Sequence, residues 1–329
     1  MEGYLLFNKK CYIPVMKIAV FYPKFSFTPD QQKTLSKLGE VVYTKGREEF
    51  PLVKLLEMAK GAQIIAVDPD PFGGFEKAKP SLTKVINSLP GLKGVCLSTT
   101  SFGWVDLEGA KKRKVSVSNI PGYSRESVAE HTLAMLLSSA KRIFVSDRRT
   151  QKNKYRLEMG FELKDKALGI IGLGNIGSRV AELAIGIGMK VIAFNRTSMK
   201  MKGVKMVSFN QLLKTSDFIS LNTTHEAKNN GMIGKAEISK MKKGVIIVNT
   251  VDRELVDEKA MASVLKSGKV DTYAYEGEDL IHTPLSKLEN AIGIKGFAWY
   301  TKEALDNLVR IWVENIIAVA KGKPQNRVA

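Results

Sequence analysis

The sequence predicts an α/β fold in which parallel β-sheets are covered by helices. Short apolar runs rich in β-branched residues alternate with helix-length segments along the chain, which is the pattern of βαβ units. A length of 329 residues exceeds what one hydrophobic core usually supports, so two domains are expected. The apolar content of 44% and the charged content of 26% are typical of a soluble globular protein.

The predicted strands follow one another at intervals that leave room for helices. The first strand begins at Lys17, and Met16 before it has the position of a natural start. Residues 1–15 are therefore interpreted as an N-terminal extension. The predicted strands cover residues 17–21, 62–67, 94–98, 115–119, 167–172, 190–195, 217–222, 244–249 and 269–276.

Two long helices are predicted as well. The segment "SVAEHTLAMLLSSAKRI", residues 127–143, follows a turn that contains Pro and Gly, and Ser127 and Glu130 have the spacing of a capping box. His131 lies in the first turns of this helix, where a structural role is favoured over a catalytic one. The last predicted helix, residues 302–322, carries apolar side chains at helical spacing and is expected to pack on a core.

The charge pattern argues against nucleic acid and membranes as partners. A net charge of +18 arises from 51 basic and 33 acidic residues, and the basic residues are scattered without an RNA-binding aromatic signature. A solvated basic surface is therefore favoured over a nucleic-acid site. No apolar run reaches the ~18 residues that span a bilayer. Two cysteines without metal-ligand or redox spacing predict no metal site and fit a reducing cytoplasm.

The segment "GIIGLGNIGSRVAELAIGIGMKVIAFNRTS" predicts a dinucleotide site. An apolar strand ends in a G-x-G-x-x-G turn, a helix follows, and a second strand comes next, which is the specific context for this motif. Gly172 permits the tight turn, Gly174 lets the backbone approach a pyrophosphate, and Gly177 lets helix and strand pack closely. The free amides of Asn175 and Ile176 at the start of the helix are expected to face the phosphates.

The end of the second strand predicts which dinucleotide binds. An NAD-specific site has Asp or Glu there, whereas this chain has Asn195, followed by Arg196, Thr197 and Ser198. The neutral side chain of Asn195 does not repel a 2′-phosphate as a carboxylate would. Arg196 is suited to bind that phosphate. NADP(H) is the predicted cofactor, with NAD(H) as the alternative. Residues that follow later strands complete the predicted cofactor contacts: Thr223, Thr250 and Val251.

The chain resembles the D-isomer-specific 2-hydroxyacid dehydrogenases, which include D-lactate, glycerate and phosphoglycerate dehydrogenases. The resemblance is carried by "SVSNIPGYSRESVAEHTLAMLL", "LGIIGLGNIG", "GMIGKAEISKMKKGVIIVNT" and "AWYTKEALDNLVRIWVENI". It implies two Rossmann-like, doubly wound domains, the nucleotide-binding one inserted into the substrate-binding one. The expected boundaries are 16–118 with 298–329 for the flavodoxin-like substrate domain and 119–297 for the dinucleotide domain. A homodimer is implied too.

The catalytic residues that the resemblance implies are not all present. The family uses an Arg that holds the substrate carboxylate, a His that acts as acid and base, and a Glu that orients the His. Matching "NTVDRELVD" to the family's N-T-A-R-G pattern places Asp252 at the Arg and Arg253 at the Gly. Matching "IGIKGFAWYT" to its P-H-I-A pattern places Lys295 at the Pro and Gly296 at the His.

The position of the catalytic Glu depends on the register of "DTYAYEGEDL", residues 271–280. One register makes Glu276 the catalytic Glu but shortens the preceding strand. The other keeps the strand whole and places Glu276 at the family's nicotinamide-facing Asp. A core strand is harder to shorten than a loop, so the second register is favoured. Both place Glu276 near the nicotinamide.

These replacements predict a site that does not run the usual chemistry. A positioned general acid contributes about 10²–10⁴-fold in rate, and Gly296 supplies none. Asp252 at about 4 Å from a substrate carboxylate would repel it by roughly 4 kcal/mol at an effective dielectric near ~20. The sequence thus predicts an NADP(H)-binding oxidoreductase with non-standard or reduced activity through Glu276, Arg253 and Lys295.

Three alternatives to this main prediction stay open at the level of the sequence. Arg253 could turn inward while Lys295, Tyr300 or His282 donates a proton to a different carbonyl substrate. The chain could instead be a non-catalytic NADP(H) sensor or scaffold. A nucleic-acid-binding role rests on charge alone and is the weakest of these interpretations.

Overall fold

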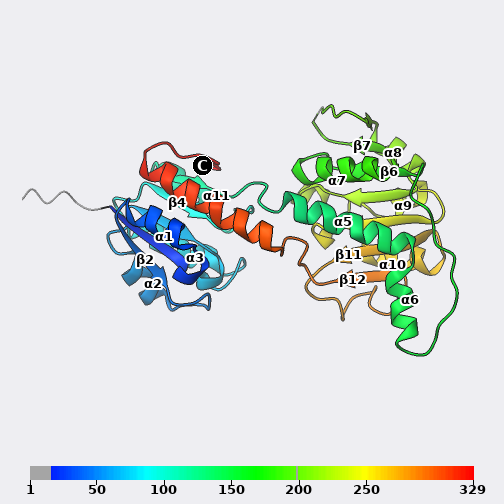
Figure 1. Cartoon of the computed structure of the whole chain (residues 1–329), viewed down its shortest axis with the longest axis horizontal. Coiled ribbons are helices and arrows are strands. Elements are labelled where there is room, and N and C mark those ends of the chain that lie inside the picture. Colours follow the sequence, from blue (N-terminus) through cyan, green and yellow to red (C-terminus); the bar gives the residue numbers. More distant parts are fainter. Residues whose placement is uncertain (1–15, 198) are drawn as a thin grey trace, which may run out of the picture. The chain divides into compact units, whose positions relative to one another are not determined.

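The computed structural model describes residues 16–197 and 199–329 and divides into two compact units (Figure 1). The first unit comprises the chain up to Tyr123 together with Asp306–Ala329, and the second comprises Ser124–Leu305. The predicted N-terminal extension, residues 1–15, and the predicted cofactor residue Ser198 lie outside the described residues.

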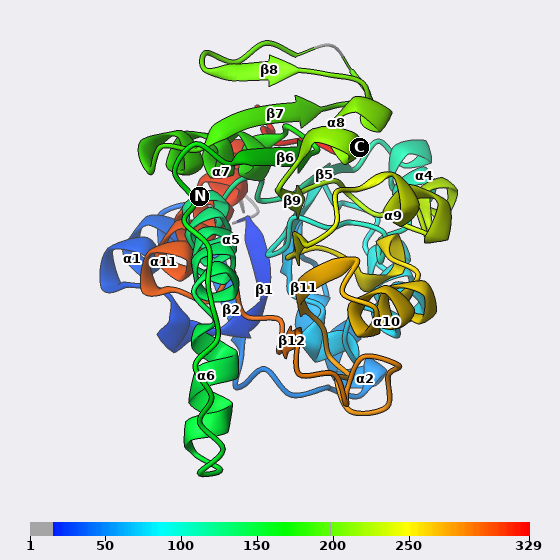
Figure 2. The same cartoon turned by 90° about the vertical axis from the view of Figure 1, so that its right-hand side faces the viewer.

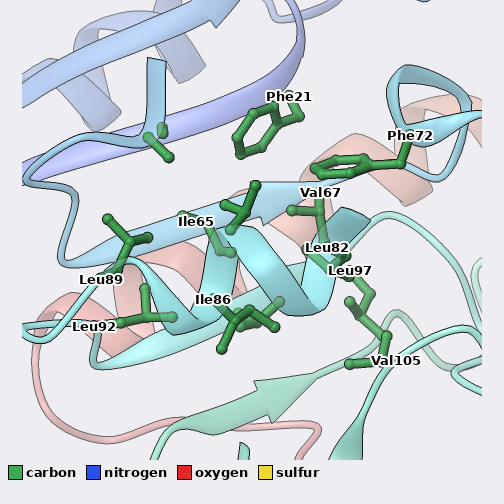
Figure 3. Packing of buried hydrophobic residues seen from close by; sticks show 14 of the residues in the cluster. Phe21, Ile65, Val67, Phe72, Leu82, Ile86, Leu89, Leu92, Leu97 and Val105 are labelled. Carbon is green, nitrogen blue, oxygen red and sulfur yellow. The ribbon is translucent and has the colours of Figure 1, made fainter. Parts of the chain in front are cut away.

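The first unit is built on a five-stranded parallel sheet with the order β2-β1-β3-β4-β5. Its strands are β1 (Lys17–Pro23), β2 (Glu40–Thr44), β3 (Ile64–Val67), β4 (Gly94–Leu97) and β5 (Ser116–Ser118). Its helices are α1 (Pro29–Ser36), α2 (Leu52–Ala59), α3 (Ala78–Asn87), α4 (Leu107–Lys112) and most of α11 (Lys302–Ala320). Side chains of β1, β3 and α3, among them Phe21, Ile65 and Leu82, form one continuous apolar core (Figure 3).

The second unit is built on a seven-stranded parallel sheet with the order β12-β11-β10-β9-β6-β7-β8. Its strands are β6 (Ala167–Ile171), β7 (Lys190–Phe194), β8 (Val204–Met206), β9 (Phe218–Leu221), β10 (Val245–Asn249), β11 (Val270–Glu276) and β12 (Ala291–Ile294). The chain winds outward from β6 through β7 and β8, then returns to β9 on the other side of β6. A crevice for a ligand forms at the carboxyl ends of the strands where the order reverses in this way.

Helices cover both faces of this second sheet. Figure 2 shows α5 (Arg125–Ala140) and α7 (Asn175–Gly186) on one face, and α9 (Lys235–Lys240) and α10 (Glu258–Lys266) on the other. The remaining helices of the unit are α6 (Ile143–Thr150) and α8 (Phe209–Thr215). The prediction of two doubly wound α/β domains with parallel sheets is confirmed.

Three strands were not predicted, and all three lie at the edges of sheets: β2, β8 and β12. Their sequences are "EVVYT", "VKM" and "AIGI". An edge strand has one neighbour and needs fewer apolar residues than a central strand, so its apolar run is short or interrupted. Apolar runs in the sequence therefore identified the centres of both sheets better than their edges.

The boundaries between the units differ from the predicted ones. The first falls between Tyr123 and Ser124 rather than after residue 118, because Ile120 is buried in the first unit's core and donates its amide to the carbonyl of Thr99 at 3.3 Å. The second falls between Leu305 and Asp306 rather than after residue 297. Residues 298–305 belong to the second unit.

The predicted capping box is wrong. Helix α5 begins at Arg125, so Ser127 lies inside it and its hydroxyl donates to the carbonyl oxygen of Ala298 instead of capping. That hydrogen bond ties the segment after β12 to α5. Within residues 16–197 and 199–329, no helix is long and apolar enough to cross a membrane.

Candidate functional site

The turn between β6 and α7 has the geometry that its three glycines predict. Gly172 has a φ of +95°, and a Cβ on it would lie 2.7 Å from the carbonyl oxygen of Asn222. A Cβ on Gly177 would lie 2.0 Å from the carbonyl oxygen of Gly172, so no side chain fits between helix and strand. Gly174 is exposed, and a Cβ there would meet nothing within 4 Å. The backbone at Gly174 is therefore open to an incoming phosphate.

The start of α7 offers free backbone amides beside this open backbone. Gly174 is the N-cap residue, Asn175 is the first helical residue, and Ile176 follows. Amides in the first turn have no partner within their own helix, and they carry the positive end of the helix dipole. The turn and the helix start thus fit a pyrophosphate without any charged side chain.

Asn195 connects the end of β7 to the glycine turn. Its side-chain oxygen accepts a hydrogen bond from the amide of Leu173 at 3.1 Å, and its side-chain nitrogen donates to the carbonyl and hydroxyl oxygens of Thr197 at 3.0 and 2.9 Å. Arg196 is exposed and pairs with Glu226 at 3.0 Å. The charge-assisted bond from Arg196 lowers the pKa of Glu226 to about 2. This surface pair leaves Arg196 in contact with solvent.

The remaining predicted cofactor residues line the same edge of the sheet. Thr223 follows β9, and its amide nitrogen would lie 2.9 Å from a Cβ on Gly172. Thr250 and Val251 follow β10. The hydroxyl oxygen of Thr250 lies 3.1 Å from that of Thr132 on α5, and the amide of Val251 donates to Asn249 at 3.1 Å.

A cavity of about 700 Å³ opens at the carboxyl ends of β10 and β11. Its wall comes from residues 250–258, from residues 276–279, and from Gly296 and Trp299 after β12. Thr250 and Val251 are part of this wall, so the cavity adjoins the predicted cofactor contacts. Six carboxyl groups line it: Asp252, Glu254, Glu258, Glu276, Glu278 and Asp279.

Glu276 ends β11 and is the buried member of this set, with 8% of the residue exposed. Its Oε1 accepts hydrogen bonds from the amides of Phe297 and Ala298 at 3.0 and 2.9 Å. The residue lines the cavity, and the hydrogen bonds of its carboxyl group among the described residues all use Oε1. Burial raises the pKa of Glu276 above the usual glutamate range, although the two amides and His131 oppose the shift.

The strand that ends in Glu276 is complete. β11 spans seven residues and pairs with β10 from Val270 to Tyr275, with one irregularity near its start.

His131 lies against Glu276, which its sequence context did not predict. Its Nε2 is 3.5 Å from Oε1 of Glu276, and its ring packs edge-on against Phe297 at 5.2 Å between centroids. The same Nε2 is buried and makes no hydrogen bond within the described part of the chain. A buried carboxyl and a histidine with an unfilled ring nitrogen therefore lie side by side.

Arg253 is held in the wall of the cavity by an acidic partner. It opens a short 3₁₀ helix (Arg253–Leu255), and its guanidinium binds Glu258 at 2.5 and 2.7 Å and the carbonyl oxygen of Asp279. The guanidinium also lies over the ring of Tyr275, 5.6 Å from its centroid. These contacts neutralise the positive charge of Arg253. The alternative in which Arg253 turns inward requires that charge to bind a substrate.

Asp252 and Gly296, the positions matched to the family's Arg and His, both line the cavity. Asp252 is exposed, and its carboxylate has no partner in residues 16–197 and 199–329. A Cβ on Gly296 would approach only Oε1 of Glu278, at 3.5 Å, which is ordinary contact. A side chain at position 296 would therefore fit.

The alternative proton donors lie outside the cavity wall. Lys295 is 68% exposed and pairs with Glu278 at 3.2 Å. His282 is 83% exposed and lies 3.5 Å from Asp279, while Tyr300 is exposed and packs against Trp299. None of the three lines the cavity.

Much of the cavity wall was not predicted from the sequence. The residues concerned are Glu254, Glu258, Glu278, Asp279 and Trp299. The acidic run "EGED" at 276–279 was a readable signal. The place of Glu258 in the cavity wall could not be predicted from the sequence, because it depends on where α10 begins.

Comparison with known proteins shows that this chain belongs to the D-isomer specific 2-hydroxyacid dehydrogenase family. The family model described as "D-isomer specific 2-hydroxyacid dehydrogenase, NAD binding domain" matches residues 133–294. A D-3-phosphoglycerate dehydrogenase of Archaeoglobus fulgidus is 36% identical over 251 residues, covering 73% of this chain and 48% of that protein. This chain thus spans about half the length of that relative.

Two further proteins are similar to this chain over most of their own length. A glyoxylate reductase of Thermococcus litoralis is 32% identical over 262 residues, covering 74% of this chain and 79% of that protein. The solved structure of an acyclic imino acid reductase in complex with NADPH and D-Arg is 28% identical, with a TM-score of 0.80. That alignment covers 95% of this chain and all of the other.

Proposed function

Because the chain belongs to the D-isomer specific 2-hydroxyacid dehydrogenase family, we propose that it is a cytoplasmic, NADP(H)-preferring reductase whose proton donor is Glu276. The relatives reported above are named a D-3-phosphoglycerate dehydrogenase and a glyoxylate reductase. The proposed difference from those relatives lies in the substrate half of the site, where Asp252 and Gly296 stand at the positions matched to the Arg and the His.

The proposed preference for NADP(H) is supported by the end of β7. Asn195 presents an amide rather than a carboxylate, and Arg196 follows it at the surface. Arg196 would exchange its solvent-exposed partner Glu226 for the 2′-phosphate, because exposed ion pairs contribute little, about 0–1 kcal/mol. The solved imino acid reductase, which contains NADPH, supports the same choice.

The observation that carries the proposal is the buried carboxyl of Glu276 at the cavity. Burial raises its pKa, so the group keeps its proton to a higher pH than an exposed glutamate does. Glu276 lines the cavity, and its Oε2 is not used by the hydrogen bonds to Phe297 and Ala298, so this oxygen is the one proposed to carry the donated proton. Such a donor is worth about 10²–10⁴-fold in rate, which is the contribution that Gly296 does not make.

The proposed reaction needs one proton and one hydride. When bound, NADPH supplies the hydride. The acceptor carbon of a C=O or C=N group takes the hydride, and its oxygen or nitrogen takes the proton of Glu276. The resulting carboxylate is stabilised by the amides of Phe297 and Ala298. It regains a proton from solvent before the next turnover.

A simple 2-keto acid is a poor acceptor on this proposal. Its carboxylate would meet Asp252 where the family's pattern has Arg, and Arg253 is bound to Glu258. The imino acid reductase among the similar structures supports an acceptor of another kind, since that protein is named for a C=N substrate.

The proposal is tested with Glu276→Gln, which keeps an oxygen that can accept from the amides of Phe297 and Ala298. NADPH oxidation is measured with a panel of keto acids, aldehydes, ketones and cyclic imines. The variant should lose about 10²–10⁴-fold in kcat while NADPH affinity, measured by calorimetry, stays unchanged. Glu162→Gln is the matched control, because Glu162 is exposed and outside the cavity. Equal kcat in both variants would remove Glu276 as the donor.

A non-catalytic NADP(H) sensor is the second candidate, supported by Asp252 and Gly296 at the two catalytic positions. On that reading the pure protein binds NADPH tightly but oxidises it with no member of the panel. Reduction of any panel member that depends on Glu276 would exclude the sensor.

A further inference from the structure

We infer that the cavity beside Glu276 selects substrates that carry an ammonium or guanidinium group near the reacting carbon. The inference rests on the proposed function, because the same cavity must hold the hydride acceptor. It concerns the charge of that acceptor, which the family relationship does not supply.

The charges around the cavity are unbalanced. Six carboxyl groups and one guanidinium, that of Arg253, belong to its wall. Arg253 is matched by Glu258 at 2.5 Å and contributes no free positive charge. Apart from Glu276, the carboxylates without a partner in the wall are those of Asp252, Glu254, Glu278 and Asp279.

Positive groups outside the wall do not restore the balance. Lys295 reaches Glu278 at 3.2 Å, but both side chains are largely exposed and their interaction is screened by solvent. His282 lies 3.5 Å from Asp279 and is 83% exposed. Asp252 and Glu254 make no side-chain hydrogen bond or ion pair within residues 16–197 and 199–329.

The acidic wall is opposite in sign to the rest of the protein. The chain has 51 basic and 33 acidic residues, for a net charge of +18. Thirteen residues of the cavity wall nevertheless include six acidic residues and one basic residue. A local field that opposes the net charge raises the concentration of cations at this cavity rather than over the whole surface.

Two further features of the wall suit a cationic ligand. The buried Glu276 lines the cavity, and its Oε2 is not used by the hydrogen bonds that Oε1 accepts from Phe297 and Ala298. Trp299 lines the same space. The face of a Trp ring attracts ammonium and guanidinium groups. Both features act on the ligand independently of the exposed carboxylates.

The first experiment measures binding without turnover. Agmatine, pentanediol and glutarate have similar lengths and are cationic, neutral and anionic. In the presence of NADPH, calorimetry should show agmatine binding at least about 100-fold more tightly than glutarate, with an affinity that falls as salt rises. Glutarate binding as tightly as agmatine would overturn the inference.

The second experiment assigns the effect to the cavity. Asp252→Asn combined with Glu278→Gln should weaken agmatine by roughly 10-fold or more, because two carboxylates are neutralised without a change in shape. Glu162→Gln removes one exposed carboxylate elsewhere in the same unit and should leave agmatine binding unchanged. Equal loss in the control, or no loss in the double variant, would contradict the assignment.

The third experiment measures turnover with three methyl ketones that differ in charge. Aminoacetone should be reduced with a kcat/KM at least about 100-fold above that of hydroxyacetone, and pyruvate should be slowest. Reduction of hydroxyacetone in preference to aminoacetone would refute the inference and leave the proposed reductase intact. Tight, carboxylate-dependent binding of agmatine without reduction of any acceptor would refute the reductase and leave only the preference of the cavity for cationic ligands.

Discussion

Two regions at one edge of the same parallel sheet are built from different parts of the chain. Around β6 and β7, the site is made of backbone: an open Gly174, a tight contact at Gly177 and the first amides of α7. Around β10 to β12, the site is made of side chains, and six of these are acidic. A backbone site tolerates few changes, because Gly172 and Gly177 leave no space for a Cβ. A side-chain site changes its chemistry with one substitution at a time.

The two glycines Gly177 and Gly296 show this difference directly. A Cβ on Gly177 would lie 2.0 Å from a backbone oxygen, whereas a Cβ on Gly296 would lie 3.5 Å from the end of the flexible Glu278 side chain. The first glycine is required by packing. The second leaves room for a side chain that is absent.

The largest expected effect comes from making the side-chain region resemble that of the family. Asp252→Arg, Arg253→Gly, Lys295→Pro and Gly296→His together should raise glyoxylate reduction by NADPH about 10²–10⁴-fold, since a general acid and a carboxylate partner are restored. Steady-state kinetics on the native and fourfold-substituted proteins measure the change. Robust native reduction of glyoxylate, pyruvate or hydroxypyruvate would show that the region already works by another route. Absence of measurable reduction by both proteins would favour the non-catalytic NADP(H) sensor.

The next effect comes from adding one methyl group to the backbone region. Gly177→Ala should destabilise the protein by about 1–3 kcal/mol through overpacking and should weaken NADPH binding strongly, because helix and turn must separate. Urea unfolding and calorimetry report the two changes. Gly186→Ala is the control, since it lies in the same helix and its Cβ would meet nothing within 4 Å. If Gly177→Ala changed neither the free energy of unfolding nor the NADPH affinity, the turn would not be a close-packed phosphate site.

Reversing one charge beside the backbone region should change the choice of cofactor. Arg196→Asp should remove or reverse the preference for NADPH over NADH by roughly 10-fold, because a carboxylate repels the 2′-phosphate and accepts from ribose hydroxyls. Calorimetry with both dinucleotides provides the ratio. Lys235→Asp, at another exposed basic position, should leave the ratio unchanged. Equal native affinities, or no binding of either dinucleotide, would contradict the proposed preference.

A smaller effect is expected in the pH dependence of stability. Burial raises the folded-state pKa of Glu276 above its unfolded value, so the folded protein holds this proton more tightly. That contribution to stability is present below the ordinary glutamate pKa and is lost as pH rises through the raised pKa. Glu276→Gln should therefore flatten the fall in unfolding free energy across this window. Urea unfolding at a series of pH values measures it, and Glu162→Gln should keep the native profile.

The smallest effect on either region is expected from breaking the proposed homodimer. The segment after α6, which projects from the second unit (Figure 2), exposes 85% of Leu157 and 88% of Met159. Leu157→Asp with Met159→Asp should convert a dimer to a monomer, because exposed apolar side chains mark interaction surfaces. Sedimentation measures this while NADPH affinity stays constant. Val53→Asp, at another exposed apolar residue, should leave the dimer intact. A native monomer at micromolar concentration would contradict the proposal.

The sequence by itself determined the cofactor turn and the centres of both sheets. The glycine motif around Gly172 spans about six consecutive residues, and the central strands are marked by mainly apolar runs, so both are local properties. The edge strands β2, β8 and β12 were missed because one-sided pairing permits short or interrupted runs.

Only the tertiary structure decided what surrounds the substrate half of the site. The cavity wall joins residues 250–258, 276–279 and 296–299, which meet because β10, β11 and β12 are neighbours in the sheet. The pairing of Arg253 with Glu258 and the approach of His131 to Glu276 likewise depend on where α10 and α5 pack. Charge and proton affinity in a cavity are set by neighbours in space, and spacing along the chain does not give those neighbours.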